Sequence, residues 1–138
     1  MAEKITYTLD IQAAAGPHLS TAGTNVVKAY DKVHVTLDDG GQDVEVNTQP
    51  SDNGPTQFMA IFSTEYGDQL TYKINATAND PIVLDGPQVF IGAGAVSLLD
   101  TGTSAMPEPA TKLFFTNSLG SPVTIEILVG RDVASPPP

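Results

Sequence analysis

The sequence predicts an all-β protein, namely an antiparallel β-sandwich of jelly-roll type with roughly eight to ten short strands. Three observations predict it. Apolar residues recur every second position in most segments, which is the period of a strand. Clusters of Gly, Pro, Asn and Asp separate these segments. No window of helical length has a convincing period of 3.6 residues.

Five segments alternate in the way expected of a strand with one face in a core and the other in water. At the start of the chain, Ile5, Tyr7 and Leu9 alternate with Thr6 and Thr8. The five segments are residues 5–11, 33–37, 44–47, 70–74 and 123–129.

Three further segments, residues 58–62, 88–99 and 113–115, are apolar or uncharged throughout. A strand that is apolar on both faces lies either in the middle of a sandwich or at an interface with another chain. Both interpretations stay open for residues 58–62 and 88–99. The small residues at 92–95 predict a bend or bulge that divides the second segment, with residues 97–99 continuing as strand.

Turn signals place the connections. Residues 38–42 (DDGGQ) lie between two alternating segments and predict a hairpin. Residues 50–55 form a loop with two prolines, and residues 18–25 and 101–111 are expected to be irregular. The best helix candidate, residues 12–15, is too short and is ended by Gly16-Pro17.

The length of 138 residues predicts one domain, residues 1–132, followed by a flexible Pro-rich C-terminal tail at 133–138. The 16 acidic residues against 6 Lys and Arg give a net charge of -10, which argues against nucleic acid as a partner. The absence of Cys removes disulfides and thiolate chemistry. No apolar run approaches the roughly 20 residues of a membrane helix, and no signal segment is expected at the start.

The sharpest chemical motif is Asp100-Thr101-Gly102, which follows two leucines. It resembles the active-site signature of aspartic proteases, whose retroviral-type members dimerise and supply one Asp per chain. Val129-Gly130-Arg131-Asp132 resembles a second element of that family, an apolar pair followed by Gly-Arg-Asn/Asp. Too few residues separate Gly102 from Gly130 for the strands and flap of such an enzyme, and about a hundred residues precede Asp100. The competing interpretation is a loop that begins after a buried segment.

Four other motifs have weaker chemical interpretations. Gly92 to Ser97 imitates a dinucleotide fingerprint, but no helix is expected after it. Asp38 to Asp43 offers carboxylates for Ca²⁺, although a turn explains its glycines. His18 and His34 are expected to face solvent, and Asn75-Ala76-Thr77 is a formal glycosylation sequon. We therefore predict no catalytic, cofactor-binding or metal-binding residues and no cofactor.

Residues 112–118 and 122–132 suggest a closing hairpin. With this hairpin, the all-β pattern, the absence of Cys and the Pro- and Gly-rich ends, the chain resembles small virion proteins of tailed bacteriophages. The head-decoration (cement) proteins are the most similar in style. The resemblance implies a non-enzymatic homo-oligomer, with a trimer favoured, that binds the major capsid protein or another virion protein. It would be made in the host cytoplasm and located on the capsid surface. The alternatives are a carbohydrate- or receptor-binding tail module and, second, a dimeric aspartic protease using Asp100.

Overall fold

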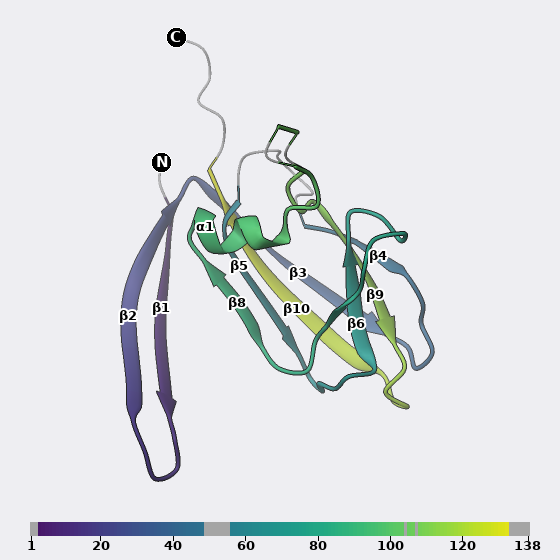
Figure 1. The fold of residues 1–138 in the computed structure, drawn as a ribbon, viewed down its shortest axis with the longest axis horizontal. Helices are drawn as coiled ribbons and strands as arrows, with labels where there is room; N and C mark the ends of the chain where they lie inside the picture. The colour runs from purple at the N-terminus through teal and green to yellow at the C-terminus, as the bar shows by residue number, and fades with distance from the viewer. Residues whose placement is uncertain (1–2, 49–55, 104, 107, 133–138) are drawn as a thin grey trace.

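Two four-stranded antiparallel sheets pack face to face, and a two-stranded ribbon lies outside them (Figure 1). The computed structural model describes residues 3–48, 56–103, 105–106 and 108–132, and it confirms the predicted all-β sandwich. The predicted loop at 50–55 and the predicted tail at 133–138 lie outside the described residues. The ten strands within these residues are β1 (Glu3–Gln12), β2 (His18–Val27), β3 (Ala29–Leu37), β4 (Val44–Asn47), β5 (Thr56–Ser63), β6 (Leu70–Ile74), β7 (Ile82–Val83), β8 (Gln88–Ile91), β9 (Lys112–Asn117) and β10 (Val123–Arg131).

The strand order is that of a jelly roll. One sheet has the order β3-β10-β5-β8 and the other has the order β4-β9-β6-β7. From β3 onward, every connection except β6 to β7 passes from one sheet to the other. Eight strands wound in this way form the two interlocked Greek keys of the jelly-roll architecture.

Two predicted hairpins are wrong. Residues 38–42 connect β3 to β4, which lie in different sheets, and the predicted closing hairpin of β9 and β10 also crosses between sheets. The segments themselves are strands, as expected. Alternation shows which side chains face a core, but it does not show whether the next strand pairs beside its neighbour or faces it across the sandwich.

Residues 93–99 are helical, so the predicted strand at 97–99 is wrong. Gly92, with φ of 93°, ends β8, and it is followed by the short helix α1 (Ala93–Val96) and the 3₁₀ turn η1 (Ser97–Leu99). Val96 and Leu99, three positions apart, are the buried residues of this segment. That spacing is the helical signal in an otherwise uncharged run.

Residues 18–25, expected to be irregular, belong to the regular strand β2. This strand pairs with β1 in continuous register from Glu3↔Val27 to Gln12↔His18. Ala22, Gly23 and Asn25 have weak β propensity, so the pairing with β1 decides their conformation.

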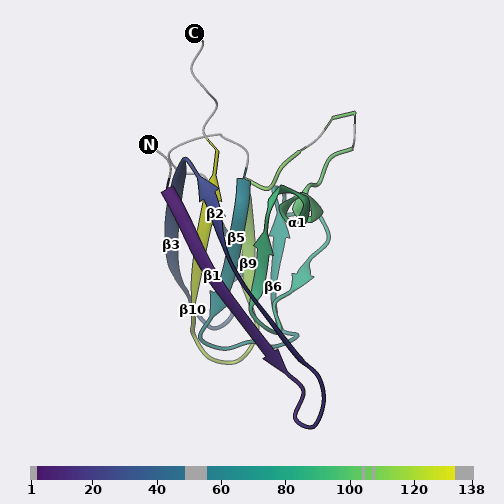
Figure 2. The same cartoon turned by 90° about the vertical axis from the view of Figure 1, so that its left-hand side faces the viewer.

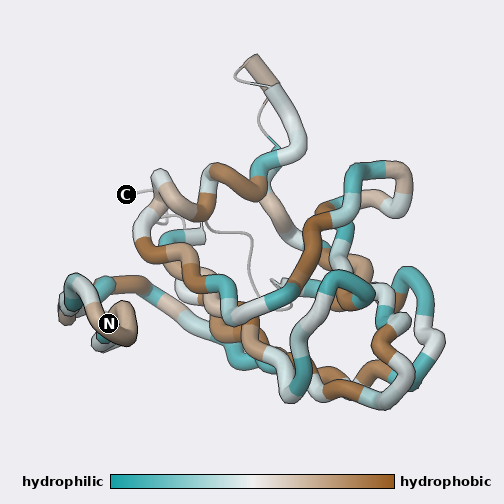
Figure 3. Tube along the Cα trace, turned by 60° about the horizontal axis from the view of Figure 1, so that its bottom comes forward, coloured by the Kyte–Doolittle hydropathy of each residue, from teal (hydrophilic) through white to brown (hydrophobic). Residues whose placement is uncertain are grey.

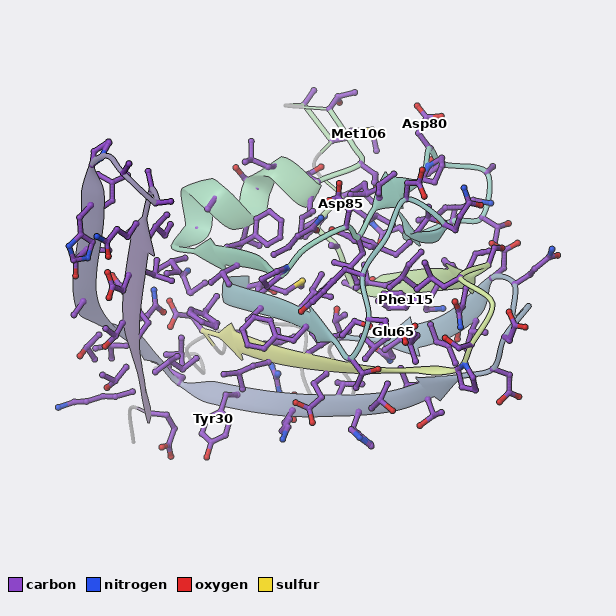
Figure 4. All side chains as sticks on the ribbon, turned by 90° about the horizontal axis from the view of Figure 1, so that it is seen from below. Tyr30, Glu65, Asp80, Asp85, Met106 and Phe115 are labelled. Atoms are coloured by element: carbon purple, nitrogen blue, oxygen red, sulfur yellow. The ribbon has the colours of Figure 1, made fainter. Side chains whose placement is uncertain are left out.

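Side chains from both sheets fill the space between them. Phe115 lies there, with its ring centroid 5.6 Å from that of Tyr72, whereas Tyr30 points away from the sandwich (Figure 4). Hydrophobic positions recur along the strands and hydrophilic ones gather in the connections (Figure 3). The fully buried Asn117 joins the β3–β4 and β9–β10 connections, because its amide donates to the carbonyls of Leu37 (3.4 Å), Asp38 (3.2 Å) and Ser121 (2.8 Å).

We predict that the burial of Tyr72 lowers the free energy of unfolding in alkaline solution. Burial raises its pKa well above the ordinary value of 10.0, and its hydroxyl donates to Oε1 of Gln88 at 2.6 Å. Above pH 10 the unfolded chain ionises Tyr72 while the folded chain keeps the proton, so the free energy of unfolding falls by about 1.4 kcal/mol per pH unit. Tyr72→Phe loses the hydrogen bond, about 1 kcal/mol at pH 8, but lacks this alkaline loss.

Urea unfolding of both proteins at about pH 8 and pH 11 measures the difference. Comparing the two proteins cancels the titration of the lysines, which they share. An equal loss of stability between the two pH values in both proteins would contradict the assignment to Tyr72.

Candidate functional site

The ribbon of β1 and β2, residues 3–27, forms an arm that is attached at its base to the outer face of the β3-β10-β5-β8 sheet. Figure 2 shows it crossing in front of that sheet, with its tip extending past the ends of the strands. One face of the arm is apolar, because Ile5, Tyr7, Leu9 and Ile11 alternate on β1. Leu19 on β2 is paired directly with Ile11 and so lies on the same face.

The base of the arm is buried on the sheet. Ile5 and Val27 pack with Phe58 and Ala60 of β5 into a small core that is separate from the main one. Val27 is 0% exposed, whereas its neighbour Val26, on the other face of the ribbon, is 57% exposed. The arm is therefore attached by one end of its apolar face.

Gly130 on β10 permits this attachment. A Cβ at this position would lie 2.6 Å from Cδ1 of Ile5 and 3.0 Å from Cγ1 of Val27, which is closer than packed carbon atoms allow. The backbone N–H of Lys28, just after the arm, donates to the carbonyl of Arg131 at 3.0 Å. The arm base thus contacts β10 through both side chains and backbone.

The ion pair of Arg131 and Asp31 holds β10 to β3 at the same end of the sheet. The Arg131 side chain is 2% exposed and its Nη1 donates to the Asp31 carboxylate. A buried guanidinium is costly unless it is paired, so this pair fixes both strands. Gly130-Arg131, considered above as part of a protease motif, thus supports the arm.

Tyr7 stiffens the middle of the arm. It is paired with Gly23, and a Cβ on Gly23 would lie 2.5 Å from the Tyr7 hydroxyl. The ring therefore lies over the glycine and covers backbone that has no side chain of its own. An aromatic residue opposite a glycine is a recognised way to stabilise a strand pair.

The distal part of the apolar face is uncovered by the described residues. Ile11 is 63% exposed and Leu19 is 68% exposed. Together with Leu9, Ser20 and Thr21 they line a shallow hollow of about 310 Å³. Exposed apolar side chains gathered in this way are typical of a surface that binds another protein.

The sheet face beyond the arm base is also partly apolar. Side chains lie in rows across its strands, and the row of Lys32, Leu128, Ala60 and Val89 follows the row that the arm covers. In the next row, Glu126 of β10 is paired with Phe62 of β5 on one side and with His34 of β3 on the other. Phe62 is 46% exposed. A groove of about 340 Å³ in this area is lined by Lys32, Ala60, Phe62, Glu126, Ile127 and Leu128.

The core interpretation of residues 58–62 is confirmed for residues 58–61, and an interface with another chain stays a prediction for Phe62. Met59 and Ile61 belong to the main core, and Phe58 and Ala60 pack with Ile5 and Val27 of the arm base, Ala60 at the border of the groove. Phe62 alone in this segment is exposed. The candidate functional site consists of the distal arm and this groove.

Asp100 organises a loop. Its Oδ1 accepts hydrogen bonds from the backbone N–H groups of Gly102 at 2.7 Å and Glu108 at 2.9 Å. A Cβ on Gly102 would lie 2.2 Å from the carbonyl oxygen of Met106, so the loop requires glycine there. The Asp-Thr-Gly sequence is explained by this turn chemistry. Ser104 and Pro107, in the same loop, lie outside the described residues.

The sequon residue Asn75 has a structural role in the same loop. Its Nδ2 donates to Thr101 Oγ1 and to the carbonyl of Pro109, both at 3.0 Å, and its Oδ1 accepts from the N–H of Thr111 at 2.9 Å. Asn75 has a φ of 66°, a conformation that asparagine tolerates better than most residues. The side-chain amide is therefore engaged within the chain.

The remaining candidate ligands are dispersed. Asp39 accepts from the N–H of Gly120 at 3.2 Å, and Asp43 is 3.3 Å from Nζ of Lys73. His18 pairs with Asp10 across the arm, while His34 lies on the sheet face. In the part of the chain that the structure describes, no three His, Asp or Glu side chains come together in a metal-binding group. The sequence segment 92–97 leads into β9 of the other sheet, so it does not form the parallel βαβ unit of a dinucleotide site.

Comparison with protein-family models gives no match, and a search of curated proteins finds no relative. Among the described residues, no helix is long and apolar enough to span a membrane.

Sequence reasoning missed the arm and the residues that support it. β1 was expected as a strand, but nothing local indicated that it would leave the sandwich with β2. Gly130 interrupts an otherwise apolar alternating strand, and an isolated glycine in such a strand can mark a close approach of another backbone or side chain. That was the one signal available.

Gly130→Ala should loosen the base of the arm while the sandwich stays folded. The added methyl group overlaps Ile5 and Val27, and overpacking of this kind costs about 1–3 kcal/mol. Hydrogen exchange of the β1 and β2 amides should accelerate, while exchange in β9 and β6 should not. Gly86→Ala is the matched control, because a Cβ there meets nothing within 4 Å. Protection of the arm that is unchanged by Gly130→Ala would contradict the docking role of Gly130.

Proposed function

We propose that this chain is a non-enzymatic structural protein of a virion, a capsid decoration (cement) protein that binds between capsid subunits and associates with copies of itself. The observation that supports it best is the arm. A strand pair that is packed on the sandwich at its base and carries exposed apolar side chains at its other end is suited to binding a neighbouring subunit. Such a role needs stable contact surfaces and no catalytic group.

The sheet face supports the same proposal. The groove beside Phe62 continues the apolar surface that the arm base already covers. Its rim carries Lys32 and Glu126, with Nζ and Oε1 3.8 Å apart. An apolar centre with a polar rim is the usual composition of a protein interface. The jelly roll itself is used by viral capsid proteins and by lectins, so it supports the class without deciding between them.

The proposal is tested on virus particles. Mass spectrometry of gradient-purified particles from a culture that carries the gene should find the chain in the head fraction. Heads that lack the chain should bind the purified protein and then release DNA at a higher temperature. Absence of the chain from particles, or heads that neither bind nor gain stability, would reject the proposal.

A pair of matched variants locates the contact. Phe62→Asp places a charge in the groove and should weaken head binding. Val83→Asp makes the same kind of change on β7 of the opposite sheet, where Val83 is 39% exposed, and should leave binding intact. Equal effects of the two variants would exclude the groove as the contact.

Carbohydrate binding is the second candidate, favoured by one observation. A hollow of about 320 Å³ is lined by Phe62, Ser63, Thr64, Tyr66, Thr124 and Glu126. Aromatic rings beside hydroxyls and a carboxylate can stack on and hydrogen-bond a sugar. On a glycan array, a signal that Phe62→Asp abolishes and Val83→Asp preserves would favour this function. No signal at millimolar sugar would reject it.

A further inference from the structure

The outer edge of β2 is long and open. β1 and β2 are ten-residue strands, the longest of the described strands, and within the described residues each pairs only with the other. A strand at an edge presents unpaired N–H and C=O groups that can pair with another chain.

The alternation of hydrogen-bonded and non-hydrogen-bonded pairs in the arm shows which backbone groups face this edge. At the arm tip, the N–H of Ala13 donates to the carbonyl of Pro17 at 3.1 Å. In an antiparallel pair, hydrogen-bonded and non-hydrogen-bonded positions alternate. With the register of the arm, Ile11↔Leu19 is then a hydrogen-bonded pair and Gln12↔His18 is not. The backbone groups that point away from β1 are those of His18, Ser20, Ala22, Thr24 and Val26.

β2 lacks the usual protection of an edge. Its sequence HLSTAGTNVV contains no Asp, Glu, Lys, Arg or Pro, and its pairing has no register shift. Natural edge strands are normally blocked by charges, prolines or bulges. β1 follows that rule, because it carries Glu3, Lys4 and Asp10.

Charge indicates what pairs with β2. Two copies of a chain with a net charge of -10 repel each other, so contact between copies is favoured where neither surface is charged. Among the described edge strands, the uncharged ones other than β2 are β7 and β8, of two and four residues. Two β2 strands in antiparallel pairing bring no Asp, Glu, Lys or Arg side chains together, whereas two β1 strands would place Glu3, Lys4 and Asp10 of both copies along the contact.

We propose that β2 pairs with β2 of a second copy of this chain about a two-fold axis, which joins two arms into one four-stranded antiparallel sheet. This inference rests on the self-association that the proposed function includes, and it names the surface responsible. A contact in which both copies use the same strand is isologous and closes as a dimer, the commonest closed assembly. It places the exposed Leu19 of each copy in one continuous sheet. The trimer implied by the sequence resemblance needs a different contact.

The test uses Ala22→Pro in the full chain. Proline at position 22 removes an N–H that points to the free edge and leaves the bonds to β1 intact, as edge strands tolerate. Ala22→Ser keeps the N–H and is the matched control. Sedimentation equilibrium should give a wild-type mass twice that of one chain, and Ala22→Pro should raise the dimer dissociation constant about 100-fold.

Each alternative result overturns the pairing. A wild-type monomer at hundreds of micromolar, a wild-type trimer, or a folded Ala22→Pro dimer of unchanged affinity would do so. Circular dichroism reports whether the Ala22→Pro variant is folded. If that variant does not fold, Ala22→Lys is used in its place, because it adds a charge at the edge of β2 and should likewise dissociate the dimer. Head binding is measured separately, so a monomer that still stabilises heads rejects the pairing and keeps the decoration function.

Discussion

The close contact at Gly130 is the constraint on which the rest of the candidate site depends. Because this position lacks a Cβ, Ile5 and Val27 approach β10 closely enough to bury the base of the arm. The pair of Arg131 and Asp31 fixes the two strands beneath that contact. The docked base sets the direction in which the arm leaves the sandwich. It buries Ile5 and Val27 and leaves the distal apolar side chains, such as Leu19, exposed.

The distribution of charge complements this geometry. A chain with a net charge of -10 stays soluble and resists random contact between copies. The acids occupy turns and the polar faces of strands, whereas β2 and β5 carry none. These two strands supply the edge of the arm and the exposed Phe62. The uncharged edge of β2 is therefore also an edge that the fold leaves accessible.

The strands were predictable from sequence because a period of two is a local property, and the segments around Ile5, Val35, Ile61, Tyr72 and Ile127 all form strands. The partner of each strand was not predictable, since a strand shows the same alternation whether the next strand lies beside it in one sheet or opposite it in the other sheet. β2 was missed because its Ala, Gly and Asn residues become regular only when β1 pairs with them. The site was missed for a related reason: it depends on contacts between distant segments, such as Gly130 with Val27.

The motifs that looked most chemical show why the apolar surfaces matter more. Asp100 accepts two backbone N–H groups, and Asn75 and Asn117 each join separate connections. A jelly roll in which nearly every connection crosses between sheets leaves many backbone groups at its ends, and polar side chains must satisfy them. Their oxygens and nitrogens are thus committed within the chain. The exposed groups left uncommitted on the arm and the groove are backbone edges and apolar side chains, which recognise partners by shape and strand pairing.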